Sequence, residues 1–240
     1  MAELKAALQT IHADRDWWWK IALGGALWLT VIGWPIVEGF QIESLENSQR
    51  GFPTPLPRWT RFGDKIVVGL FALLIDFFYF VFPLMLAGML SFCGLLATSL
   101  SATGGITGSV TVIALGITGL YLLAVWLLGA SPIGKQRYAS EGDMERTLSA
   151  RLILELVREP ERHLYLLARL RSLPPYILAG LLLIAAVWLA KISFLLTLAA
   201  AWLGLSVLLY ARLITIQLYL RATRTAQRIR FDLLYQENET

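Results

Sequence analysis

The sequence predicts an all-α integral membrane protein, because three long stretches of the chain carry almost no charge. Only Asp76 is charged among the 35 residues from Ile66 to Leu100, and Gly104–Ala130 contains no charged residue. The 47 residues from Pro174 to Leu220 contain only two charges. A helix of about 20 apolar residues crosses the ~30 Å hydrocarbon core of a bilayer, so these stretches are long enough for four spans.

The remaining segments of the 240 residues are too short for a soluble domain with its own core, since none exceeds about 45 residues. We therefore treat residues 1–240 as a single membrane domain. Its expected elements are an amphipathic surface helix over 1–20, a broken or re-entrant segment over 21–40, a cytoplasmic Pro-rich loop over 41–65, spans at 66–100 and 104–130, a cytoplasmic loop with an amphipathic helix over 131–173, spans at 174–191 and 192–220, and a cytoplasmic tail over 221–240.

The first apolar run, Ile21–Val37, is only 17 residues long and contains glycines near both ends and Pro35. If it spans the bilayer, the N-terminus is extracellular. If it is a broken or re-entrant helical pair, both of its flanks are cytoplasmic. We favour the re-entrant interpretation, although helices broken at membrane depth must pack against protein or line water.

The run Ile66–Leu100 would be ~52 Å long as one straight helix, which exceeds the thickness of the hydrocarbon core. Pro83 is expected to kink it. We interpret Arg61–Asp76 as a partly interfacial approach, followed by a span over Phe77–Leu100. An uncharged turn at Ser101–Gly105 then leads into the next span.

The distribution of Lys and Arg predicts the orientation, because basic residues gather on the cytoplasmic side of membrane helices. Eight lie between Ser131 and Arg171 and four follow Leu220, whereas Lys191 stands alone between the last two spans. The last two spans should therefore run in–out–in, with the long basic loop and the C-terminus cytoplasmic. The expected location is the plasma (inner) membrane or an internal membrane.

Two amphipathic helices are expected at the membrane surface, one within 1–20 and one at 148–157, with Arg151 and Glu155 spaced for an i,i+4 ion pair. Each is followed by acidic residues, aromatic residues and an apolar run. The two segments are either a weak internal repeat or two independent examples of a helix that precedes a span. The apolar faces consist of Leu4, Leu8 and Ile11 in the first helix and of Leu148, Leu152 and Leu156 in the second.

Three charged residues form a possible intramembrane polar site: Glu38, Asp76 and Arg212. Carboxylates within the membrane are costly and often mark ion paths, but Asp76 could also lie near the interface. Glu38 is more easily explained as a hydrogen-bond acceptor for backbone groups freed at the break. Arg212 could pair with Asp76 or Glu38 across the bundle, or it could extend its side chain to the cytoplasm.

The loop from Arg50 to Gly63 is the least generic part of the chain. Its prolines at 53, 55 and 57 favour a stiff, extended conformation. The basic and aromatic residues beside them would suit anionic lipid headgroups or an acidic partner surface, although the loop could simply return the chain to the membrane. The residues of this expected binding patch are Arg58, Trp59, Arg61, Phe62 and Lys65.

The sequence contains no recognisable set of catalytic, cofactor-binding or metal-ligating residues. The single cysteine, Cys93, lies in an apolar run and is best explained as a small buried residue. The two histidines, His12 and His163, fall in the surface segments rather than inside a span, and no hydrolase or phosphate-binding motif is present. We expect neither a cofactor nor a nucleic-acid partner.

Several short motifs resemble those of a widespread prokaryotic family of polytopic membrane proteins of unknown function. The resemblance covers roughly residues 8–90 and implies the membrane fold without implying an activity. The motifs are Asp14-x-Asp16-Trp17, Lys20-Ile21-x-x-Gly24-Gly25, Pro35-Ile36-Val37 with Gly39, Arg50-Gly51, Leu56-Pro57-Arg58-Trp59 and Gly63-Asp64.

These observations favour a non-catalytic accessory or scaffolding subunit of a membrane assembly. Its expected partners are the bilayer, other membrane-protein subunits or a second copy of itself, bound at the cytoplasmic face. The alternative is a small permease or channel subunit that uses the broken first segment and Asp76.

Overall fold

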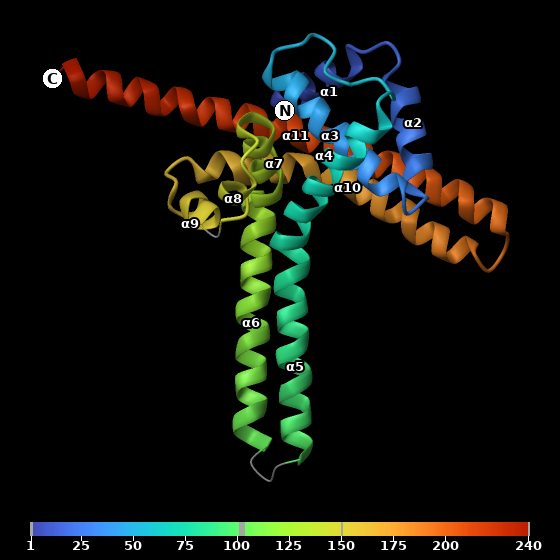
Figure 1. Cartoon of the computed structure of the whole chain (residues 1–240), viewed down its shortest axis with the longest axis vertical. Helices are drawn as coiled ribbons and strands as arrows, with labels where there is room; N and C mark the ends of the chain where they lie inside the picture. The colour runs from blue at the N-terminus through green and yellow to red at the C-terminus, as the bar shows by residue number, and fades with distance from the viewer. Residues whose placement is uncertain (1, 101–103, 150, 240) are drawn as a thin grey trace.

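The computed structural model describes residues 2–100, 104–149 and 151–239, and the described residues form helices and connecting turns without strands (Figure 1). The expected turn at 101–105 therefore lies largely outside the described residues. The elements are α1 (Ala2–His12), α2 (Trp17–Trp28), α3 (Gly33–Gln49), α4 (Phe62–Asp76), a π-helical turn (Phe77–Val81), α5 (Phe82–Leu100), α6 (Gly104–Leu128), α7 (Ala130–Glu141), α8 (Met144–Thr147), α9 (Arg151–Arg158), α10 (Arg162–Leu189) and α11 (Phe194–Glu239).

Three helical stretches of the described chain are long and apolar enough to cross a membrane, namely Phe62–Gly94, Arg162–Leu189 and Phe194–Asp232. A fourth is possible if Leu115–Leu128 and Ala130–Glu141, which are bent by 54° relative to each other, count as one span. This pattern is compatible with a membrane protein of three or four spans.

Two helical hairpins extend from the rest of the molecule. Figure 1 shows α5 and α6 running side by side downwards, while α10 and α11 extend together to the side. The turn between α10 and α11 lies at 190–193, around Lys191, where the sequence predicts it. However, α10 begins at Arg162 and continues through Pro174 and Pro175, so it is much longer than the predicted span.

The first apolar run is broken, because α2 ends at Trp28 and α3 starts at Gly33. Glu38 lies in the second turn of α3, and its carboxylate accepts hydrogen bonds from the side chains of Lys135 and Arg212 instead of from the predicted backbone groups at the break. The first predicted element is also shorter than the expected 1–20, since α1 ends at His12 and Trp17 already begins α2.

A π-helical turn, rather than the expected kink, accommodates Pro83 in its helix. Pro83 has no N–H and its ring clashes with the carbonyl four residues earlier, and the wider π turn at Phe77–Val81 relieves that clash. The preceding α4, which covers the predicted interfacial approach, packs along α3, and its residues Ala72 and Ile75 are buried. Its placement at the membrane interface stays a prediction.

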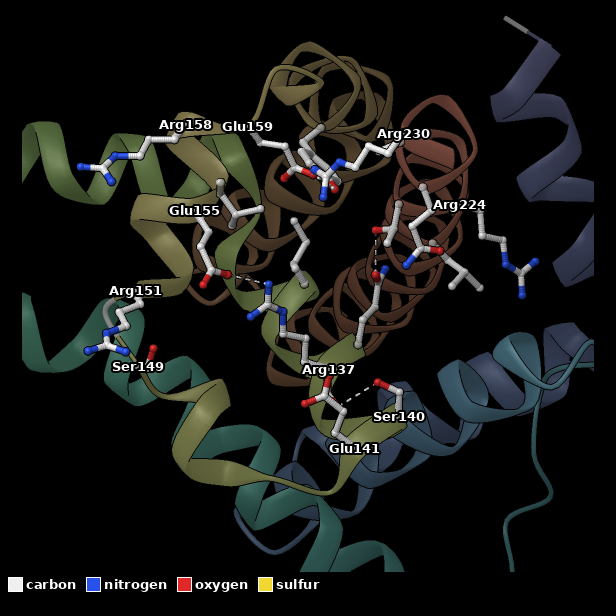
Figure 2. A pocket seen from close by; sticks show the side chains of 18 of the residues that line it. Arg137, Ser140, Glu141, Ser149, Arg151, Glu155, Arg158, Glu159, Arg224 and Arg230 are labelled. Carbon is white, nitrogen blue, oxygen red and sulfur yellow. Dashed lines mark hydrogen bonds and ion pairs between the residues drawn. The ribbon is translucent and has the colours of Figure 1, made fainter. Parts of the chain in front are cut away.

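The two predicted amphipathic helices both occur. In α1, Ala7 and Ile11 are buried, and the helix packs against α11. In α9, Leu156 is buried, but Glu155 contacts Arg137 of α7 at 2.8 Å instead of pairing with Arg151 (Figure 2). Glu155 on the exposed face of α9 therefore forms an ion pair with a neighbouring helix instead of with a residue of its own helix.

Candidate functional site

Four charged side chains from four helices meet where the two hairpins join the rest of the chain. We call them the charged quartet: Glu38 of α3, Asp76 of α4, Lys135 of α7 and Arg212 of α11. The structure thus brings together all three residues of the predicted intramembrane polar site and adds Lys135.

Each charge of the quartet contacts both charges of the opposite sign. Lys135 Nζ lies 2.9 Å from Glu38 Oε2 and 2.7 Å from Asp76 Oδ2. Arg212 Nη2 lies 3.1 Å from the same two oxygen atoms, and Arg212 Nη1 also donates to Glu38 Oε1. Ser131 donates a hydrogen bond to Asp76 Oδ1. Two carboxylates and two cations leave no net charge.

The quartet is withdrawn from solvent to different degrees. The side chains of Glu38 and Lys135 are 1% and 4% exposed, whereas those of Asp76 and Arg212 are 25% and 22% exposed. The guanidinium of Arg212 also lies over the ring of Trp28, 5.4 Å from its centroid. Such buried pairs stabilise little compared with apolar packing, but the loss of one member leaves a charge without compensation.

The quartet positions the α5–α6 hairpin, because two of its residues lie just before and just after that hairpin in the chain. Asp76 ends α4 directly before the π-helical turn that leads into α5, and Lys135 lies in α7, the helix that follows α6. The turn from α6 to α7 is made at Gly129, which has a φ of 70° that favours glycine. The quartet therefore fixes both connections of the α5–α6 hairpin to α3 and α11.

A further buried cation, outside the quartet, ties α10 to the same region. Arg169 Nε donates to the carbonyl of Trp126 at 2.9 Å, and its guanidinium lies 4.9 Å from the ring centroid of Trp126 and 5.4 Å from that of Tyr219. Aromatic faces and a carbonyl stabilise this charge in place of a carboxylate. Arg169 therefore links α10 to α6 and α11.

The predicted basic–aromatic patch is only partly at the surface. Trp59 stacks on Phe40 with ring centroids 4.2 Å apart, and its Nε1 donates to the carbonyl of Lys20 at 3.0 Å. Lys65 is buried, with Nζ 2.5 Å from Glu43 Oε2. These two residues were expected to face lipid or a partner, but they hold the loop against the helices.

The other three patch residues are exposed. Arg58 and Arg61 lie in the loop before α4, and Phe62 is the first residue of that helix. Arg61 adopts a left-handed conformation with a φ of 55°. Their binding to lipid or to a partner stays a prediction.

The histidines and their neighbours do not form a common site. His12 contacts the hydroxyl of Tyr210 at 2.8 Å, and His163 is exposed at the start of α10. Glu159 and Glu161, which precede His163 in sequence, instead contact Arg230 of α11. Within the described ranges, no group of three or more potential ligands is placed to bind a metal ion.

Comparison with known proteins identifies a family but no described relative. A family model described as "Protein of unknown function (DUF4013)" matches residues 22–187. This match confirms the predicted resemblance to a family of unknown function and extends it beyond residue 90 into the second half of the chain. No curated protein and no solved structure matches the sequence.

Proposed function

Because the chain belongs to the family of proteins of unknown function DUF4013, we propose its role from its geometry: a non-catalytic, multi-pass accessory membrane protein. In this proposal four helices, α5, α6, α10 and α11, cross the bilayer, and α2 with α3 forms a re-entrant pair. The opposite, polar end lies at the cytoplasmic face and engages a membrane-protein partner or anionic lipid.

The observation that supports this proposal most strongly is that exposed apolar side chains and charged side chains lie in different parts of the structure. Large apolar side chains are exposed on both hairpins, including Val112 at 70%, Val187 at 71% and Leu195 at 73%. Exposed apolar surface of this extent marks contact with a membrane or another protein. The charged residues gather instead where the hairpins meet, around α7, α9 and the last part of α11.

The proposal requires a rearrangement of the two hairpins. They leave the charged quartet crosswise in Figure 1, whereas helices that cross one bilayer are tilted by only ~20° on average. In the membrane, the α5–α6 hairpin would turn about the π turn at Phe77–Val81 and the bend at Gly129, which lie between the quartet and the hairpin. The quartet would keep its contacts, and the contact of Arg169 with Trp126 would be lost. The tips of both hairpins would then reach the same side.

Cysteine labelling tests this arrangement. Starting from a Cys93→Ser variant without cysteine, single cysteines replace Thr54, Gly104, Ser140 or Lys191. In sealed right-side-out vesicles, a membrane-impermeant maleimide should label the variants at Gly104 and Lys191 directly. It should label the variants at Thr54 and Ser140 only after permeabilisation, because these lie on the basic, cytoplasmic side.

The Ser140→Cys variant in detergent is the control for reactivity, since Ser140 is exposed at the end of α7. Labelling of Lys191→Cys and Ser140→Cys from the same side would contradict the in–out–in hairpin. Labelling of Gly104→Cys from the cytoplasmic side alone would show that α5 and α6 do not span.

The accessory role predicts a partner that depends on the exposed part of the loop. Purification in mild detergent from the native membrane should retain a stoichiometric partner that is lost when Arg58 and Arg61 are both changed to Ala. Both side chains are exposed, so this variant should fold normally, unlike a change at Trp59. The matched control is Arg15→Ala, which removes an exposed arginine outside the loop.

A homo-oligomer without a partner would contradict the accessory role and favour the alternative of a small permease. That alternative requires the charged quartet to carry an ion or proton, so Asp76→Asn should abolish flux in reconstituted vesicles. The complete pairing of the quartet supports the structural role over the permease, because no charge is left for a solute.

A further inference from the structure

Three arginines of α11 face a small hollow that opens between α1, the end of α3 and α11. We call it the arginine hollow; its volume is about 420 Å³, and its arginines are Arg221, Arg224 and Arg228. Because these positions are three and four residues apart in a helix, their side chains leave α11 on one face. Thr10, Ser48 and Thr225 add hydroxyl groups to the lining.

The positive charge of the hollow is not neutralised by the described part of the protein. Arg221 Nη2 donates to Ala6 O and Thr10 Oγ1, both at 3.1 Å. Arg224 Nη2 donates to carbonyl oxygens at the end of α3, including that of Ser48 at 2.9 Å. These acceptors are uncharged. Arg228 is exposed and contacts no carboxylate within the described ranges.

Among the described residues that line the hollow, the one carboxylate, Glu3, already pairs with Arg171 of α10. The larger cavity in Figure 2, of about 1730 Å³, is different: there Arg137 contacts Glu155, and Arg230 contacts Glu159. Three like charges side by side without a counter-charge repel one another, and an anion bound between them would remove that repulsion.

We propose that the arginine hollow binds a phosphate-bearing anion, which in the membrane is the headgroup of an anionic phospholipid. Guanidinium groups bind phosphate oxygens with two parallel hydrogen bonds, and hydroxyl groups can complete the coordination. The volume lies within the 300–1,000 Å³ range of ligand sites. Phe52, which is 51% exposed, lines the same hollow and offers apolar contact to the glycerol and upper acyl region.

The position in the fold supports a lipid as the source of the phosphate. The arginines follow the apolar part of α11 directly, after Leu220, at the depth where basic residues meet headgroups. This inference rests on the proposed placement of that end of α11 at the cytoplasmic membrane surface. The cysteine labelling above tests the placement separately, without reference to anion binding.

The test is a lipid titration of the full-length protein in dodecyl maltoside micelles. The readout is the midpoint of thermal unfolding, measured by tryptophan fluorescence at each lipid concentration. Phosphatidylglycerol should raise the midpoint in a saturable manner, and phosphatidylcholine at the same concentration should not. Arg228→Gln should weaken the apparent affinity about fivefold, because one arginine near headgroups contributes ~1 kcal/mol. Arg228 is exposed and makes no ion pair or hydrogen bond with the residues that the structure describes, so this variant should fold like the parent.

The matched control is Arg158→Gln, which removes an exposed arginine outside the arginine hollow and should titrate like the parent. Stabilisation by millimolar inorganic phosphate with the same dependence on Arg228 would identify a soluble phosphate as the ligand and keep the site. If neither phosphatidylglycerol nor phosphate raises the midpoint, or if Arg228→Gln and Arg158→Gln titrate alike, the proposal is overturned.

Discussion

Replacing Glu38 by Gln should destabilise the protein by about 3–5 kcal/mol, the usual cost of removing one member of a buried ion-paired group. The variant leaves Lys135 and Arg212 to share Asp76, so the quartet acquires a net positive charge in a buried position. The midpoint of thermal unfolding in mild detergent, measured by tryptophan fluorescence, should fall by on the order of 10 °C.

Two further variants separate the charge effect from general damage to α3. Glu46→Gln changes the same residue type on the same helix, but Glu46 makes only a 3.7 Å surface pair with Arg50 and should shift the midpoint little. A second change, Arg212→Met in the Glu38→Gln background, restores neutrality and should recover part of the loss. If Glu38→Gln and Glu46→Gln unfold at the same temperature, the quartet does not stabilise the fold.

The sequence predicts the features of this chain that depend on local composition. The long uncharged stretches indicate the helices of both hairpins, and the lone Lys191 indicates the turn between α10 and α11. The glycines and Pro35 indicate the break in the first apolar run. The sequence also indicates the pairing of Arg212 with Glu38 or Asp76 as one of two alternatives, because an ion inside an apolar helix needs a partner.

The features missed from the sequence depend on contacts between distant segments. Lys135 lies within a basic stretch of the sequence, and nothing local distinguishes it from the arginines that follow it. Charge balance was the available signal, since two buried acids require two cations and Arg212 supplies one. Trp59 and Lys65 look like surface residues in a Pro-rich loop, but Phe40 and Glu43 of α3 bind them.

The packing of α3 against α4 leads to the second large effect. The two helices cross at Gly39 and Gly69, which allow their backbones to touch. A Cβ atom on Gly69 would collide with the carbonyl oxygen of Pro35 and would lie 2.8 Å from the backbone nitrogen of Gly39. Backbone atoms cannot move aside as a flexible side chain can, so α3 and α4 would have to separate.

Gly69→Ala should therefore destabilise the protein by about 1–3 kcal/mol through overpacking, even though Ala favours a helix more than Gly does. The matched control is Gly88→Ala in α5, where nothing lies within 4 Å of the added Cβ and the unfolding midpoint should stay level or rise. Equal midpoints for the two variants would contradict the close crossing. Because Glu38 and Asp76 lie on the separated helices, Gly69→Ala should also reduce the loss caused by Glu38→Gln when the two changes are combined.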